Sequence, residues 1–198
     1  MTANDQAYDS HAGNGYLSNN DIGFWCKESG GTNRVLAHVD TNDIGQFGDT
    51  SLVENAMNTR AKAYAQLSGS QSVPTGVATL VELDTEIYDI GGDFDVGSYK
   101  FVTPVAGYYL IIGCVRVDDI DDGDSLRAEI YVDGAVVARG EARCPGANLI
   151  MHTNVQTVYY VAATKDIELY AYQNEGNNQD VIAGLNTFMS VHLLSIGN

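Results

Sequence analysis

The most informative part of this chain is the stretch GDFDVGSYKFVTPVAGYYLIIGCVRV, residues 92–117. It predicts a loop, a short strand at Tyr99–Phe101, a turn at Pro104–Gly107 and a long apolar strand at Tyr108–Val117. One face of the long strand carries Tyr108, Leu110, Ile112 and Cys114, and the other carries Tyr109, Ile111, Val115 and Val117. A sheet with one face in water alternates apolar and polar residues. This strand therefore needs a core on one face and a second cover on the other, for which a neighbouring subunit is the obvious source.

The rest of the C-terminal two thirds also reads as strands. They are expected at Val77–Leu83, Ser125–Val132, Ala135–Ala138, Val155–Ala163, Ile167–Tyr172 and Thr187–Leu194. In the second of these, Leu126, Ala128, Ile130 and Val132 point inward, opposite Arg127, Glu129 and Tyr131. Asp133-Gly134 then predicts a tight hairpin turn, because both residues tolerate positive φ. Many short strands at this spacing indicate an all-β sandwich or jelly roll.

Short motifs in these strands resemble a known family. The order Phe-Asp, Tyr-x-Phe and Pro-x-x-Gly-Tyr-Tyr within residues 94–109 is similar to that of complement C1q-like domains, relatives of the tumour necrosis factor jelly roll. The final strand, with Phe188 followed by Leu193-Leu194, matches the family's closing strand. The resemblance covers Ala61 to Asn198 and implies a C1q/TNF-like jelly-roll head that assembles as a homotrimer.

The N-terminal third has a different character. Residues 1–18 are polar and are expected to form a flexible arm that could anchor the chain to a virion. Residues 19–60 resemble the stem of a viral fibre or spike, because Asn20-Asp-Ile-Gly recurs as Asn42-Asp-Ile-Gly around a strand at Arg34–Val39. A small β-meander packed on the head is the alternative. Within Thr50–Tyr64 the apolar spacing predicts a short helix that joins this stem to the head at residues 61–198, with a simple linker turn as the alternative.

The net charge and the first residues of the chain limit which partners and which cellular compartment are expected. The sequence has 10 Lys and Arg against 26 Asp and Glu, which gives a net charge of −16. Such a surface repels nucleic acid and anionic membranes. The first residues, MTANDQAYDS, lack the basic and apolar regions of a signal peptide, and no window has the length of a membrane span. We therefore expect a protein that is made and kept in a cytoplasm or is carried out of it inside an assembly; the stem resemblance favours the second, a virion made in a host cytoplasm.

The sequence contains no motif for catalysis, so no enzyme is expected. One acidic loop, with Asp118, Asp119, Asp121, Asp122 and Asp124, is a speculative calcium site, and a solvated turn is the favoured alternative. No other cofactor is expected. The cysteines Cys26, Cys114 and Cys144 have no metal-type spacing and are expected to be free thiols, although a Cys114–Cys144 pair is an alternative.

Tyrosines and apolar residues are the candidates for the trimer interface, because tyrosine is favoured where its ring is buried and its hydroxyl reaches water. The expected set is Tyr108, Tyr109, Ile111, Val115, Tyr170 and Tyr172. Loops at Asp118–Asp124, Gly140–Asn148 and Asn174–Gly184 are the candidates for ligand contacts.

The resulting hypothesis is a homotrimeric virion structural protein, such as a bacteriophage fibre, spike or capsid decoration protein. Its N-terminal arm would contact other virion proteins, and its head would attach to a host surface glycan or protein or simply decorate the particle. The alternatives are a cellular C1q-like trimeric adhesion or ligand-binding module and a fibre-borne carbohydrate-active enzyme.

Overall fold

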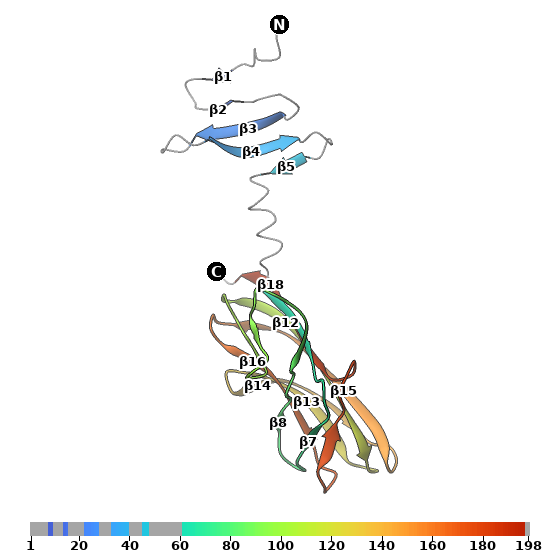
Figure 1. Ribbon diagram of the computed structural model, residues 1–198. Coiled ribbons are helices and arrows are strands. Elements are labelled where there is room, and N and C mark those ends of the chain that lie inside the picture. The colour runs from blue at the N-terminus through green and yellow to red at the C-terminus, as the bar shows by residue number, and fades with distance from the viewer. Residues whose placement is uncertain are drawn as a thin grey trace. The chain divides into compact units, whose positions relative to one another are not determined.

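In the computed structural model the chain divides into two compact units, residues 1–59 and 60–198. Side chains are described for residues 61–196, and of the N-terminal unit only its strands are described. These are β1 (Tyr8–Asp9), β2 (Asn14–Gly15), β3 (Ile22–Lys27), β4 (Asn33–Val39) and β5 (Gly45–Phe47). They pair in sequence order into one antiparallel sheet (Figure 1).

Two of the expected N-terminal features lie largely outside the described residues. Only β1 and β2 are described within the expected arm at residues 1–18. The short helix expected within Thr50–Tyr64 falls on residues up to Arg60, which lie outside the described range, so it stays a prediction there; from Lys62 on the chain forms a strand. Lys62–Tyr64 begin the strand β6 (Lys62–Gln66), because every residue of this segment pairs with a strand on each side.

The C-terminal unit, hereafter the head, is a sandwich of two antiparallel sheets (Figure 1). The first, the six-stranded sheet, contains β10 (Phe94–Asp95), β11 (Lys100–Val102), β16 (Asp166–Gln173), β13 (Ser125–Val132) and β14 (Ala135–Arg143), with β8 (Thr79–Leu80) beside β16. The second, the seven-stranded sheet, contains β7 (Gln71–Val73), β17 (Gln179–Val181), β12 (Gly107–Ile120), β18 (Phe188–Ile196), β6 and β9 (Thr85–Ile90), with β15 (Leu149–Val161) on the other side of β12. The predicted all-β jelly-roll class is confirmed.

The hydrophobic core lies between the two sheets. From β12 it receives Tyr109, Ile111 and Val115, and from the six-stranded sheet Leu126, Ile130 and Leu169, all fully buried. The predicted inward face of Ser125–Val132 is thereby confirmed. The Tyr109 hydroxyl donates to the Val105 carbonyl at 2.7 Å, which satisfies the one polar atom that this large side chain brings into the core.

One side of the sandwich is closed where β14 passes β15. A Cβ atom on Gly140 would collide with the Asn154 carbonyl oxygen, so the backbones come too close for any side chain. The hairpin before β14 turns at Asp133 and Gly134, whose φ angles are 51° and 78°. Both are positive, as the sequence predicted for a tight turn between twisted strands.

The expected strand at Val77–Leu83 is shorter than predicted. Only Thr79 and Leu80 pair with β16, opposite Ala171 and Tyr170. Val77 is exposed, whereas Val81 and Leu83 reach the core from an irregular segment. The apolar and β-branched residues of this segment therefore indicated buried positions correctly, but they did not indicate a continuous hydrogen-bonded strand.

Candidate interaction face of the head

The outward surface of the seven-stranded sheet carries an apolar stripe. In antiparallel strands, paired residues share a face, so Tyr108 and Leu110 of β12 lie beside Tyr160 and Val158 of β15. Tyr108, Val158 and Tyr160 are 49%, 53% and 47% exposed, and their partner Leu110 is half-buried. We call these four residues the apolar stripe.

The stripe is built for contact with another apolar surface. The Tyr108 and Tyr160 rings pack edge to face with centroids 5.5 Å apart, which leaves part of each ring in water. Leu194, near the end of the neighbouring strand β18, is also 46% exposed. A cluster of large apolar side chains on a sheet face is uncommon on a monomeric protein and marks an interaction site.

An aromatic cluster flanks the stripe on the side of β18, β6 and β9. Tyr64 stacks on Phe188 with ring centroids 5.1 Å apart and on Tyr88 at 6.0 Å. His192, which is paired with Leu110 across the sheet, has its Nε2 atom 2.9 Å from the Tyr88 hydroxyl and 2.9 Å from the Ser190 hydroxyl. Partial burial, with the positive charge of Lys62 nearby, lowers the pKa of His192 and favours a neutral ring on this face.

The structure divides the predicted interface residues among three places. Tyr108 lies on the apolar stripe. Tyr109, Ile111 and Val115 are fully buried in the core of their own subunit, so their side chains cannot reach a partner. The prediction that these three residues lie in the interface was wrong. Successive residues of β12 point to opposite faces of the sheet, and these three point into the core.

Tyr170 and Tyr172 lie on the outward face of the other sheet. Tyr170 packs against Tyr131 at a centroid distance of 4.1 Å, and the Arg127 guanidinium sits 4.5 Å from the Tyr172 ring centroid. Polar partners surround them, since Arg139 donates to the buried Glu129 carboxylate at 2.6 Å. This face lies on the opposite side of the sandwich from Tyr108, and a role of Tyr170 and Tyr172 in the trimer interface stays a prediction.

The acidic loop does not gather its carboxylates. The Asp118 carboxylate faces the Arg116 guanidinium at 3.7 Å, and the Asp121 carboxylate accepts the Asn148 backbone N–H at 3.1 Å. Within residues 61–196, no three His, Cys, Asp or Glu side chains are grouped as a metal ion requires. Calcium binding at Asp118, Asp119, Asp121, Asp122 and Asp124 stays a prediction.

Both cysteines of the head are buried free thiols. Cys144 donates weakly to the Ile120 and Gly146 carbonyls, at 3.1 and 2.9 Å. Burial raises the pKa of the Cys114 thiol, which keeps it protonated and unreactive.

The sequence prediction did not include the part of the stripe that β15 supplies. The alternating residues Gln156, Val158 and Tyr160 mark one face of that strand, which was a readable signal. The sequence could not predict the register of β12 and β15, which places Val158 opposite Leu110 and Tyr160 opposite Tyr108. Register depends on contacts between segments about fifty residues apart along the chain.

Comparisons with known proteins agree with this architecture. No family model matches the sequence, and no curated protein matches it. Among solved structures, the chain is similar to Eiger TNF from S. frugiperda, with 9% identity and a TM-score of 0.55 over 71% of this chain and 96% of that one. It is also similar to the globular domain of zebrafish complement 1qA, with 10% identity and a TM-score of 0.50 over 70% and 99% of the two chains. For murine APRIL the identity is 13% and the TM-score 0.51 over 68% and 99%.

These likenesses define the class of the head as a TNF/C1q-like jelly roll. At such low identity they establish the fold alone. In the part of the chain that the structure describes, no helix is long and apolar enough to cross a membrane.

Proposed function

We propose that the chain forms a homotrimer whose heads pack together through the apolar stripe. The observation that carries the proposal is the exposure of Tyr108, Val158 and Tyr160 on a sheet whose other face already covers the core. Burying a large apolar side chain contributes about 1.5–3 kcal/mol, so covering the stripe is a strong drive for association. The TNF/C1q-like fold supports the same assembly, since the resemblance of the sequence to C1q-like domains implies a trimer.

The proposed trimer is a virion structural protein that presents its heads to a host surface. The division into two units supports this role, because an N-terminal unit can hold the chain on a particle while the head remains accessible. Three linked heads also convert three weak contacts into one strong attachment through effective concentration. A net charge of −16 per chain keeps such a particle surface soluble. No catalytic step is part of the proposal.

A cellular adhesion or ligand-binding module is the second candidate. The specific observation in its favour is that the similar structures named above come from animals, namely S. frugiperda, zebrafish and mouse. The head fold serves both candidates equally. Antibodies to the head separate them, since a virion protein is detected on purified virus particles and a cellular module on uninfected cells.

The native mass of the purified full chain tests the trimer. The chain has a mass of 21.3 kDa, so light scattering or native mass spectrometry is expected to give three times that value. A monomer across a wide concentration range would contradict the proposed assembly and leave the apolar stripe without a subunit partner.

A further inference from the structure

The head has an open polar hollow on its surface, away from the apolar stripe. Its volume is about 630 Å³, which lies within the range typical of small-molecule sites. Three parts of the chain line it: the segment 67–74, which contains β7, residues from Thr79 to Asp84, and Tyr99. It is distinct from the three loops that the sequence offered for ligand contacts.

The lining groups suit a ligand with many hydroxyl groups. Ser68, Ser70, Ser72 and Thr79 bring hydroxyls, and Glu82 and Asp84 bring carboxylates. Carboxylates accept strong hydrogen bonds from hydroxyl groups, while serine hydroxyls both donate and accept. No Lys or Arg is among the lining residues, so an anionic ligand would meet only negative charge.

The walls of the hollow are held in place by side-chain hydrogen bonds. The Asp84 carboxylate accepts from the Ser68 backbone N–H at 2.8 Å and from the Ser68 hydroxyl at 2.5 Å. These bonds lower the pKa of Asp84 and keep it ionised. The Gln71 amide donates to the Leu80 carbonyl at 2.7 Å and accepts from the Glu82 N–H at 2.9 Å. The site is thus ordered before a ligand arrives, which reduces the entropy lost on binding.

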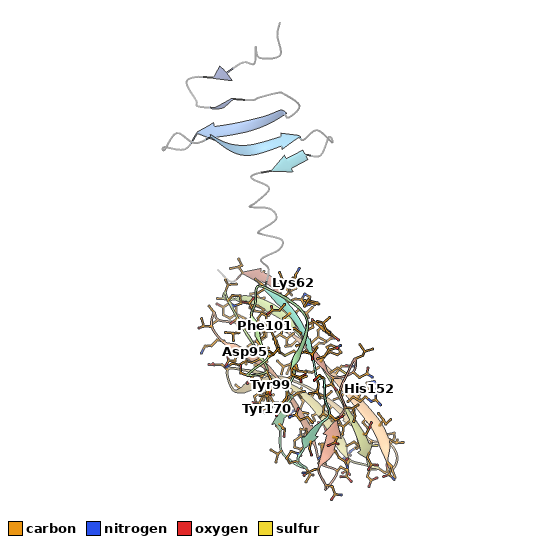
Figure 2. The ribbon with its side chains drawn as sticks, in the orientation of Figure 1. Lys62, Asp95, Tyr99, Phe101, His152 and Tyr170 are labelled. Atoms are coloured by element: carbon orange, nitrogen blue, oxygen red, sulfur yellow. The ribbon has the colours of Figure 1, made fainter. Side chains whose placement is uncertain are left out.

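Tyr99 supplies the aromatic residue of the hollow at a strained backbone position. Its φ is 60°, a region that a bulky residue rarely adopts and that glycine adopts freely. The preceding turn is fixed by Asp95, whose carboxylate accepts the Gly97 N–H at 2.9 Å and the Ser98 hydroxyl at 2.5 Å (Asp95 and Tyr99 are labelled in Figure 2). A strained tyrosine where glycine would be relaxed points to a role for its side chain.

We infer that this hollow binds a neutral saccharide, with Glu82, Asp84 and the serine hydroxyls bonding the sugar hydroxyls and Tyr99 supplying an apolar contact. The inference rests on the proposed function for its biological role, because it names the ligand class of a head that attaches to a surface. The lining residues all belong to the head, so saccharide binding can be tested independently of the stripe that the proposed trimer uses.

The test is binding of the full chain to immobilised neutral oligosaccharides built from glucose, galactose, mannose or N-acetylhexosamine, with sialylated and sulfated ones for comparison. Binding to at least one neutral oligosaccharide is expected, and preference for the anionic ones would overturn the inference. Glu82→Gln is expected to weaken binding by about tenfold, because a neutral amide oxygen accepts weaker hydrogen bonds than an ionised carboxylate. Glu86→Gln is the matched control on β9, since Glu86 is exposed outside the hollow, and it should bind like the unmodified chain.

Two further variants separate binding from folding. Gly69→Trp should block the hollow with a bulky side chain, and its Cβ has room because no atom lies within 4 Å of that position. Tyr99→Gly should still give a folded head, because glycine relieves the positive φ of 60°, and yet lose about tenfold in affinity. If Tyr99→Gly lowered the melting temperature and left affinity unchanged, Tyr99 would be structural and the inference would fail.

The native mass of the same sample distinguishes the two proposals. A trimer that binds no neutral saccharide overturns the inference and leaves the assembly standing. A monomer that binds one, with the loss in Glu82→Gln, supports the inference and removes the proposed trimer. Binding that no hollow variant weakens places the sugar elsewhere and overturns the inference.

Discussion

Gly140 shows how much a single position can constrain this sandwich. Any side chain there would collide with the backbone of β15 at Asn154, because the two backbones leave no room for a Cβ atom. Gly140→Ala is therefore expected to destabilise the head by about 3 kcal/mol, the upper part of the range for overpacking. Urea unfolding measures this change, and Gly69→Ala, with no atom within 4 Å, is the control. Equal stability of the two variants would show that β14 and β15 do not pack so closely.

His192 makes the stability of the head sensitive to pH. Its pKa is lowered in the folded chain by partial burial and by Lys62, from an ordinary value of 6.5. Below that value the unfolded chain takes up a proton more readily than the folded one, so folding stability falls as the pH drops through 6.5 towards the lower folded pKa. Above 6.5 both states are neutral at this residue and the penalty is absent.

The expected outcome is that the melting temperature of the natural chain falls more between about pH 7.5 and about pH 5 than that of His192→Gln. The groups facing His192 are Tyr88 and Ser190, which bond its Nε2, and Lys62, which raises the penalty for a second positive charge. His152, an exposed histidine on β15, gives the control variant His152→Gln. Parallel curves for the natural chain and His192→Gln would refute the linkage.

At the scale of elements, the end of β16 is held by one buried amide. Gln173 is fully buried, and its Nε2 donates to the Val73 carbonyl at 3.0 Å and the Asn177 carbonyl at 2.8 Å. Its Oε1 accepts the Glu175 N–H at 2.7 Å. This one side chain therefore ties β7 and the loop after β16 to the end of the six-stranded sheet.

Gln173→Leu is expected to lower the free energy of unfolding by about 2–3 kcal/mol, because it leaves the carbonyl of the fully buried Val73 without a partner and removes the bonds to Asn177 and Glu175. Thermal unfolding followed by circular dichroism measures the loss. Asn178→Leu, at an exposed position in the loop after β16, is the control and should change stability little. A loss of under about 1 kcal/mol in Gln173→Leu would mean that water replaces the amide.

The strands themselves were largely predictable from sequence, and their partners were not. Alternation in Ser125–Val132 and the Asp133-Gly134 turn identified β13 and its hairpin, because these signals are local. Tyr109 was misassigned because both faces of β12 are apolar, so composition could not say which face meets the core. The polar hollow could not be predicted from sequence for a related reason. Tyr99, Gln71 and Glu82 lie apart along the chain, and only the folded structure brings them together.

At the scale of the whole molecule, Tyr108 and Tyr172 offer a paired test of which outer face mediates assembly. Tyr108→Asp places a charge in the apolar stripe, and because Tyr108 is 49% exposed the subunit should still fold. We expect this variant to be monomeric by light scattering, since an unpaired charge in an apolar interface opposes association. Tyr172→Asp lies on the opposite face and should remain trimeric. A trimer in both variants would exclude the stripe as the interface.

The position of β6 bears on how the head responds to mechanical load. As the first strand of the head, it lies between β18 and β9, and Lys62–Gln66 are paired on both sides. A pull applied at Ala61 along the axis of β6 must shear both ladders at once, because antiparallel hydrogen bonds lie perpendicular to the strands. Such a force cannot break the hydrogen bonds of the two ladders one after another. Tension along this axis is therefore resisted by many hydrogen bonds that must break together.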